Sequence, residues 1–239
     1  MGPMASAKAF IGSVLGQFLF HQVTVTQVRE LSPRFRWIGF AGEGLRDEPC
    51  EAGDKIQVFL PSLGMRTYTP LAWDSGKGTG ALLVYLHGAS PGADWGRTVR
   101  PGERFQFLGP RRSLKLGEHA GPVVLFGDET SLGLAGSLRT DAKLEVTSVL
   151  EVTSREESAA VLRELGLEGA EVERTPGDAH LLEVHERLRA ALAQRPEALL
   201  VLTGRAQSIQ ALKSRFKLEG PRAASRSKPY WSVGKTGLD

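Results

Sequence analysis

The segment Arg66-Thr67-Tyr68-Thr69-Pro70 places a permanent cation, an aromatic ring and two hydroxyls within five residues. It follows the apolar run 55–61, so we expect it to continue as an extended strand. Side chains alternate on a strand, so Arg66, Tyr68 and Pro70 share one face and Thr67 and Thr69 the other. A guanidinium suits phosphate oxygens and a ring suits an aromatic system, which predicts an anionic, planar ligand. A surface Arg–Tyr pair is the alternative interpretation.

The loop 87–95 follows the apolar strand expected at 82–86 and leads into a helix. Glycines let a backbone approach an anion, and amides at a helix start point toward it, so this loop predicts a phosphate cradle. A tight loop without a ligand is the alternative. Residues 88–92 also match a serine-hydrolase elbow, but Pro91 lacks the N–H that would complete the oxyanion hole. The candidate binding residues of this loop are His87, Gly88, Pro91, Gly92, Ala93 and Trp95.

An acidic turn, Asp128-Glu129-Thr130, follows the apolar run 123–126. Ligands of open α/β sheets bind at the carboxyl ends of strands, where these side chains can accept from amines or ribose hydroxyls. An acidic helix start with Asp128 as its N-cap is the alternative. A GxGxxG fingerprint is absent from the sequence. Near the end of the chain, Trp231 could shield a planar cofactor or seal a core edge.

The histidines and the cysteine are not spaced as the ligands of a metal site. His180 and His185 are five residues apart around Glu183, which is not the HExxH spacing, and we expect an ordinary surface helix there. Cys50 is the single cysteine, so no intrachain disulfide can form and a reducing compartment fits.

The composition is that of an ordinary globular protein. A hydrophobic fraction of 41% and a charged fraction of 24% in 239 residues give no sign of disorder and allow two domains. A net charge of +3 is too weak to argue for nucleic acid. We predict no membrane span, because the apolar N-terminal stretch is short and interrupted. Its apolar residues are spaced as in a short amphipathic helix that packs on the body or on a partner.

Two domains must position these residues. From His21 to about 118 short alternating strands are separated by Gly and Pro turns, which predicts an antiparallel Greek-key barrel. From 119 to 239 continuous apolar strands alternate with helices, including one at 155–165 capped by Ser154 and one at 181–192. This second pattern predicts a parallel α/β sheet. Residues 1–20 form the expected N-terminal helical extension.

In their order along the chain, these motifs resemble the siderophore-interacting protein family of the ferredoxin-reductase-like flavoproteins. The resemblance runs from about Gln22 to Gly234, and it also includes 101–103, 109–111 and Tyr230. It implies FAD bound between a barrel and an α/β nucleotide domain. By position, residues 66–70 and the loop residues named above look like the FAD cradle, with Arg66 near the pyrophosphate and Thr69 near the isoalloxazine. Asp128, Glu129 and Thr130 look like the segment beside the flavin.

The chain departs from the family pattern at several places. Leu71 stands where the family commonly has Arg, and residues 131–135 and the end at Trp231-Ser232 also differ. Gly204-Arg205 replaces a usual Gly-Glu, and Arg205 is our candidate for the nicotinamide nucleotide phosphate.

The resemblance implies a cytoplasmic, FAD-dependent oxidoreductase that reduces ferric siderophores with electrons from NADH or NADPH. The flavin performs the redox chemistry, so no catalytic acid or base is assigned. Two alternatives stay open. One is a repurposed family member that acts in biosynthesis or supplies electrons to another redox protein. The other is a binding module without redox activity.

Overall fold

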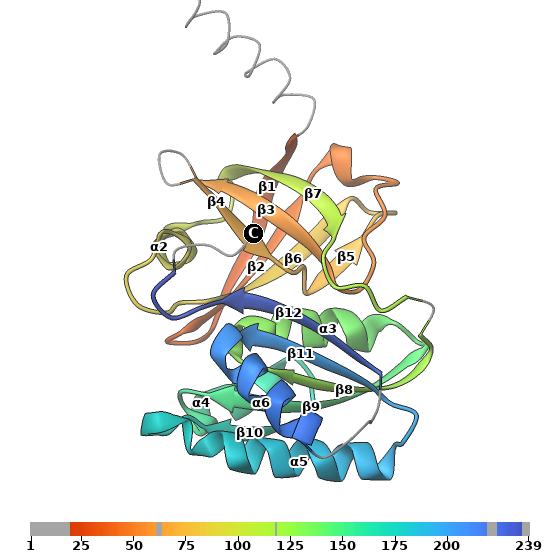
Figure 1. Cartoon of the computed structure of the whole chain (residues 1–239). Helices are drawn as coiled ribbons and strands as arrows, with labels where there is room; N and C mark the ends of the chain where they lie inside the picture. The colour runs from red at the N-terminus through yellow and green to blue at the C-terminus, as the bar shows by residue number, and fades with distance from the viewer. Residues whose placement is uncertain (1–19, 61–63, 118, 219–223, 236–239) are drawn as a thin grey trace, which may run out of the picture.

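The computed structural model describes residues 20–60, 64–117, 119–218 and 224–235. The expected N-terminal extension therefore lies outside the described residues, apart from Phe20. Two sheets follow one another along the chain, and they lie in two layers of the molecule (Figure 1).

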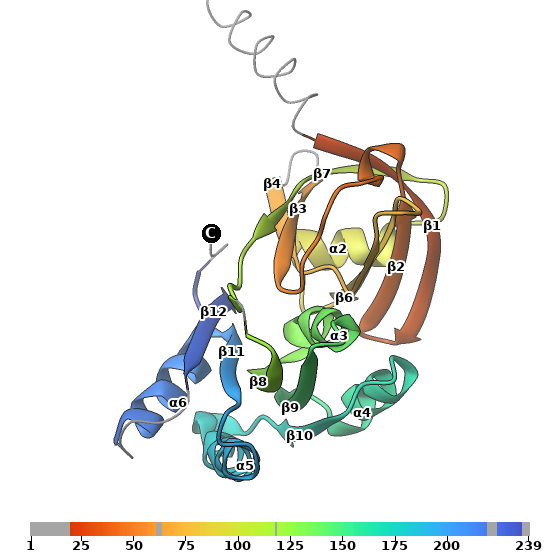
Figure 2. The same ribbon diagram turned by 90° about the vertical axis from the view of Figure 1, so that its right-hand side faces the viewer.

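The first sheet has seven antiparallel strands in the order β4-β3-β7-β1-β2-β6-β5. Its alternating sequence produces one apolar face: along β3, Ile56 and Val58 are completely buried while Phe59 is exposed. The sheet curls around this core, as Figure 2 shows. The strands are β1 (Phe20–Ser32), β2 (Phe35–Ala41), β3 (Asp54–Leu60), β4 (Gly64–Tyr68), β5 (Ala72–Asp74), β6 (Thr79–Tyr85) and β7 (Arg104–Arg112). A 3-10 turn, η1 (Glu43–Leu45), and one helix, α2 (Pro91–Thr98), complete this part.

The second sheet has five parallel strands in the order β10-β9-β8-β11-β12. Successive residues of β8 enter different cores: Val123 and Leu125 pack on one face, Val124 and Phe126 on the other. This explains the continuous apolar runs and confirms the α/β prediction. The strands are β8 (Gly121–Gly127), β9 (Leu144–Val152), β10 (Gly169–Glu173), β11 (Leu199–Arg205) and β12 (Ser225–Trp231). The helices are α3 (Leu132–Thr140), α4 (Arg155–Glu164), α5 (His180–Gln194) and α6 (Ala206–Leu218), with 3-10 turns η2 (Glu129–Ser131) and η3 (Pro176–Asp178).

Helices α5 and α6 cover one face of the parallel sheet, while α3 and α4 lie on the face toward the barrel (Figures 1 and 2). Ser154 caps α4 as expected, because its side chain accepts from the amide of Glu157. His180 and His185 are both buried on α5, whereas Leu182 and Glu183 of the same helix are exposed. The helix is amphipathic, and both rings lie on its inner face.

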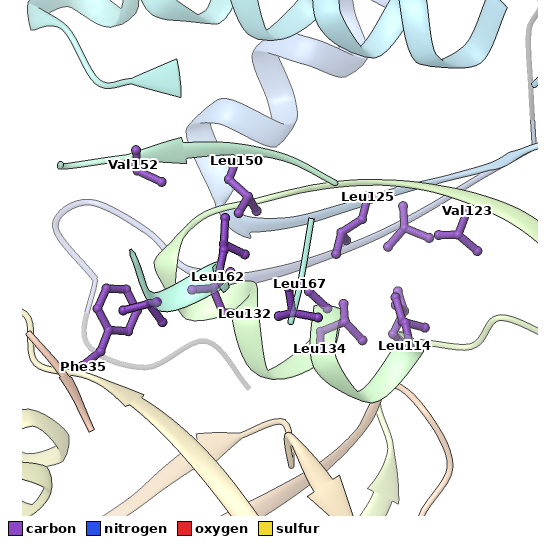
Figure 3. Close-up of a cluster of buried hydrophobic side chains, with 14 of the residues drawn as sticks. Phe35, Leu114, Val123, Leu125, Leu132, Leu134, Leu150, Val152, Leu162 and Leu167 are labelled. Carbon is purple, nitrogen blue, oxygen red and sulfur yellow. The ribbon is translucent and has the colours of Figure 1, made fainter. Parts of the chain in front are cut away.

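The two sheets share an apolar core. Phe35 and Leu114 from the barrel side pack with Leu132 and Leu134 of α3 and with the near face of the parallel sheet (Figure 3). A polar clamp lies beside this core, where Glu157 of α4 accepts from the hydroxyl of Ser32 at 2.6 Å and from Nε of Arg34 at 2.6 Å. The backbone amide of Arg34 also donates to Glu157 at 2.9 Å. Apolar packing and the clamp together hold the layers in one arrangement.

In the ranges that the structure describes, no helix is both long and apolar enough to cross a membrane. Those same ranges contain no group of three or more His, Cys, Asp or Glu side chains that could hold a metal ion.

Candidate functional site

Strand β4 presents Arg66 and Tyr68 on one face. They pair with Val58 and Ile56 of β3, whose side chains point into the barrel, whereas Thr67 points to the outer face. Burial raises the pKa of the Tyr68 phenol, so it stays neutral. The guanidinium of Arg66 donates at 2.7 Å to the carbonyl of Met65, and no carboxylate of the described residues lies within ion-pair distance of it. Since Arg66 pairs with no carboxylate in the described ranges, its guanidinium is available to an anionic ligand.

Helix α2 begins beside this cation. Ser90 caps it by accepting from the amide of Ala93 at 3.3 Å. A Cβ on Gly92 would lie 2.8 Å from the Tyr68 hydroxyl and 3.5 Å from Cγ of Arg66, so a larger residue here would require the Tyr68 side chain to shift. The positive end of a helix and a guanidinium together form an anion cradle.

The rest of the loop 87–95 supports this cradle. The ring of Trp95 lies 5.9 Å from that of Tyr68, and the exposed ring of His87 stacks on Tyr85. His87 is exposed overall, but partial burial lowers its pKa, which favours its neutral form. Gly88 has a positive φ of 54°, which favours glycine, and its carbonyl accepts from Arg97 at 2.7 Å.

The residues that follow β4, Thr69 to Leu71, contact helix α3 and strand β12. A Cβ on Gly133 would lie 2.6 Å from the carbonyl oxygen of Thr69, and one on Gly136 would lie 2.1 Å from Cδ1 of Leu71. Leu71 is thus buried against α3. The hydroxyls of Thr69 and Tyr230 are 3.4 Å apart, and burial raises the pKa of Tyr230 to about 12. Thr69, which follows β4, therefore contacts both helix α3 and strand β12.

Asp128 lies at the carboxyl end of β8 and is completely buried. Its Oδ1 accepts from the amide and hydroxyl of Thr130, and its Oδ2 accepts from Nε1 of Trp231 at 2.7 Å. A Cβ on Gly204, which has a φ of 88°, would lie 2.5 Å from Oδ2. Burial, together with the charge of Glu129, raises the pKa of Asp128 to about 6. Asp128 is therefore a helix cap, as the alternative interpretation held, and also the anchor of Trp231.

Sequence reasoning missed Arg174, which follows β10. Its Nη1 donates to Oε1 of Glu129 at 3.0 Å and its Nη2 to Oε2 at 2.8 Å. Its Nη2 is 3.9 Å from Asp128, and its Nε is 3.8 Å from the buried carboxylate of Glu151. Burial alone would raise the pKa of Glu129, but the bonds from Arg174 outweigh it and lower that pKa. The rule that selected Asp128, polar residues just after a buried apolar strand, does not reach Arg174, because β10 is an edge strand with a single buried residue.

Arg205 lies at the same sheet edge, but its guanidinium faces protein carboxylates. Its Nη2 is 2.6 Å from Asp178, its Nε donates to Ser208 at 2.7 Å, and Nε is 3.8 Å from Glu151. His180 accepts at Nδ1 from the amide of Thr175, so Nε2 carries the proton that it donates to Glu151 at 2.9 Å. These contacts form a polar network around the buried carboxylate of Glu151, which Arg174 connects to the acidic turn 128–130.

The structure brings the candidates into two adjoining groups. The first holds a cation, a helix start and two rings, and consists of Arg66, Tyr68, Gly92, Ala93 and Trp95. The second, along the sheet edge, consists of Thr69, Asp128, Glu129, Thr130, Gly204, Tyr230 and Trp231. The side chain of Thr67 faces away from both groups, and Pro91 serves as the first residue of α2. The cation and helix start of the first group suit a diphosphate, and the aromatic and hydrogen-bonding side chains at Thr69 and the second group suit a planar ring system, so the donor set suits FAD.

Comparison with known proteins agrees with this fit. Residues 61–114 match the family model of the siderophore-interacting FAD-binding domain, which spans β4, the 87–95 loop and α2. Among curated protein sequences, none matches this chain. The match confirms the resemblance and confirms FAD as the cofactor of this domain.

Solved structures share the fold over most of the chain. A siderophore utilization protein from T. fusca has 23% identity and a TM-score of 0.71, covering 92% of this chain and 95% of its own. The siderophore-interacting protein SipS from Aeromonas hydrophila has 20% identity and a TM-score of 0.69, covering 91% and 93%. Phthalate dioxygenase reductase, described as transferring electrons from pyridine nucleotides to [2Fe-2S], has 16% identity and a TM-score of 0.67, covering 89% and 69%. The chain has the ferredoxin-reductase-like fold.

Proposed function

Starting from an FAD-binding domain of the siderophore-interacting type, we propose that this chain reduces ferric siderophores in the cytoplasm with electrons from NADH or NADPH. The observation that carries the proposal is the approach of Gly92 to Arg66 and Tyr68. This approach lies inside the segment that matches the family model. Oxygen-rich chelators hold Fe(III) more tightly than Fe(II), so reduction favours release of the metal.

Bound FAD would supply the redox chemistry, which is hydride acceptance from the nicotinamide and single-electron transfer to Fe(III). The residues of the chain would bind FAD and orient it. Arg66 and the first amides of α2 would hold the diphosphate, and Tyr68 would contact the cofactor. Thr69 and the turn 128–130 would contact the flavin, and the hydrogen bond from Trp231 to Asp128 keeps the indole at this turn.

The donor half of the proposal is tested by mixing the oxidised, FAD-loaded protein with NADH or with NADPH under anaerobic conditions. We expect the flavin absorbance near its visible maximum to bleach with at least one nucleotide. Persistence of the absorbance with both would refute a pyridine-nucleotide donor.

The cofactor half is tested with Arg66→Ala. A charge-assisted hydrogen bond contributes roughly 1.5–3 kcal/mol, so FAD affinity should fall at least about tenfold in a fluorescence titration. Arg104→Ala is the matched control, because Arg104 is an exposed barrel arginine on β7. Equal affinities in the two variants would contradict the role of Arg66.

A second candidate is a repurposed member that passes electrons to another redox protein. Leu71 favours it, because this position carries a buried apolar side chain packed on Gly136 where the family commonly has a cation. It predicts a flavin that is bound and reducible but does not react with ferric chelates. Rapid reoxidation by a hydroxamate or catecholate iron complex would rule it out.

A further inference from the structure

An apolar stripe crosses the outer face of the barrel sheet. It consists of Phe20 on β1, Leu108 on β7, Phe59 on β3 and Met65 on β4, and we call it the outer stripe. Phe20 pairs with Leu108 and Phe59 pairs with Met65, so their side chains share one side of the sheet. The rings of Phe20 and Phe59 meet edge to face with centroids 5.9 Å apart.

The outer stripe does not contribute to the barrel interior. None of its four residues belongs to the buried cluster inside the barrel, and Phe59 and Met65 are 38% and 37% exposed. Contiguous exposed apolar side chains mark an interaction surface. Strand β4 is also the last strand in the hydrogen-bonded order, and such edges are commonly covered.

The chain itself supplies a matching occupant. Residues 1–19, which lie outside the described residues, end where β1 begins at Phe20. Their apolar positions recur at helical spacing and are Phe10, Ile11, Val14, Leu15, Phe18 and Leu19. A helix over 10–19 would be about 15 Å long. The distance from β1 across β7 and β3 to β4 is about 14 Å at ordinary strand spacing.

We propose that residues 10–19 form an amphipathic helix that lies across the outer stripe, with Ile11 over β4. Covalent attachment next to Phe20 gives this segment an effective concentration on the order of millimolar, which favours it over a separate partner. The bound helix braces β4 from behind, because Arg66 and Tyr68 occupy the opposite face of that strand. The proposal does not depend on which substrate the flavin reduces.

Cross-linking of the purified full-length protein tests the placement. In a Cys50→Ser background, Ile11→Cys with Met65→Cys places thiols on the apolar helix face and on the stripe. Ser13→Cys with Met65→Cys is the matched control, because Ser13 lies on the polar face. A short bismaleimide should link the first pair within one chain at least about five times faster than the second, independently of protein concentration.

Three results would overturn the proposal: equal rates for the two pairs, no link in either pair, or links mainly between chains. The last would assign the stripe to a second copy of the chain. As an independent measurement, Phe59→Ser with Met65→Ser should increase hydrogen exchange of the peptide covering 10–19. Leu182→Ser, an exposed leucine on α5, should leave that exchange unchanged. If the stripe variant also leaves it unchanged, the segment does not lie there.

Discussion

The indole N–H of Trp231 donates to Oδ2 of Asp128 at 2.7 Å. This bond ties the end of β12, the last strand of the parallel sheet, to the end of β8, the first. Asp128 is buried and its carboxyl also caps η2, so one side chain sets both the acidic turn and the terminal aromatic residue. The hydroxyl of the neighbouring Tyr230 lies 3.4 Å from that of Thr69, which links this hydrogen bond to the residue that follows β4 in the barrel.

We predict an unusual pH dependence from Asp128. Its pKa in the folded protein, about 6, lies above the value near 3.9 of an unfolded aspartate. The folded state therefore binds this proton more tightly, and the stability of the wild type relative to Asp128→Asn should rise as pH falls from about 7 to about 4. The increase is at most about 3 kcal/mol. Urea unfolding of both proteins across this range checks it, and a flat or falling difference would contradict the buried environment.

Trp231→Phe should destabilise the protein more than Trp73→Phe. The first variant removes a hydrogen bond to a carboxylate, worth roughly 1.5–3 kcal/mol, and the second a bond to the backbone carbonyl of Glu48, worth about 0.5–1.5 kcal/mol. The chemical change is the same in both, which makes them a matched pair. Unfolding measured at pH 8, where Asp128 is ionised, shows the full difference. A larger loss of unfolding free energy for Trp73→Phe than for Trp231→Phe would argue against a stabilising hydrogen bond between Trp231 and Asp128.

Arg174→Met should cost about 3–5 kcal/mol, because it leaves the buried carboxylate of Glu129 without its counter-charge. Adding Glu129→Gln should recover a large part of that loss, which a double-mutant cycle measures as coupling. The control is Arg187→Met, whose exposed pair with Glu183 contributes at most about 0.5 kcal/mol. Additive effects of the Arg174 and Glu129 changes would show that the pair is not coupled.

Gly133→Ala should destabilise the contact between α3 and Thr69 by about 1–3 kcal/mol. Alanine favours a helix by about 1 kcal/mol over glycine, but its Cβ would meet a backbone carbonyl, which cannot rotate away. Gly44→Ala is the control, since its Cβ would have an ordinary contact at 3.4 Å. Thermal unfolding compares the two, and a stabilised Gly133→Ala protein would show that Thr69 and α3 are farther apart.

Glu157→Gln should weaken the clamp between the layers by roughly 1.5–3 kcal/mol, because it removes the charge that Arg34 and Ser32 bind. Glu164→Gln, on the same helix, changes only an exposed pair with Arg29 and should cost less than about 1 kcal/mol. Chemical unfolding measures both. Equal effects would mean that the clamp contributes no more than a surface ion pair.

Local pattern was sufficient for the two sheet types. Alternation in β3 and continuous apolar runs in β8 and β11 report directly whether one or both faces of a strand are covered, so both folds could be predicted. The pattern also placed Arg66 and Tyr68 on one face, because the two-residue period of a strand is a local property. Helices α3 and α6 and strands β10 and β12 were not predicted individually, since their fit to the sheet depends on neighbours distant in sequence.

The sequence by itself determined the two sheet types, the shared face of Arg66 and Tyr68, and the order of motifs that resembles flavoproteins. Only the tertiary structure decided that Arg174 pairs with Glu129, that Arg205 faces Asp178, and that Asp128 holds Trp231. The physical reason is the separation of the partners in the sequence. Periodicity indicates the strand or helix to which a residue belongs. These partners follow different strands, and they come together only when the parallel sheet assembles. The same assembly buries Leu71 against Gly136, a contact that neither residue indicates alone.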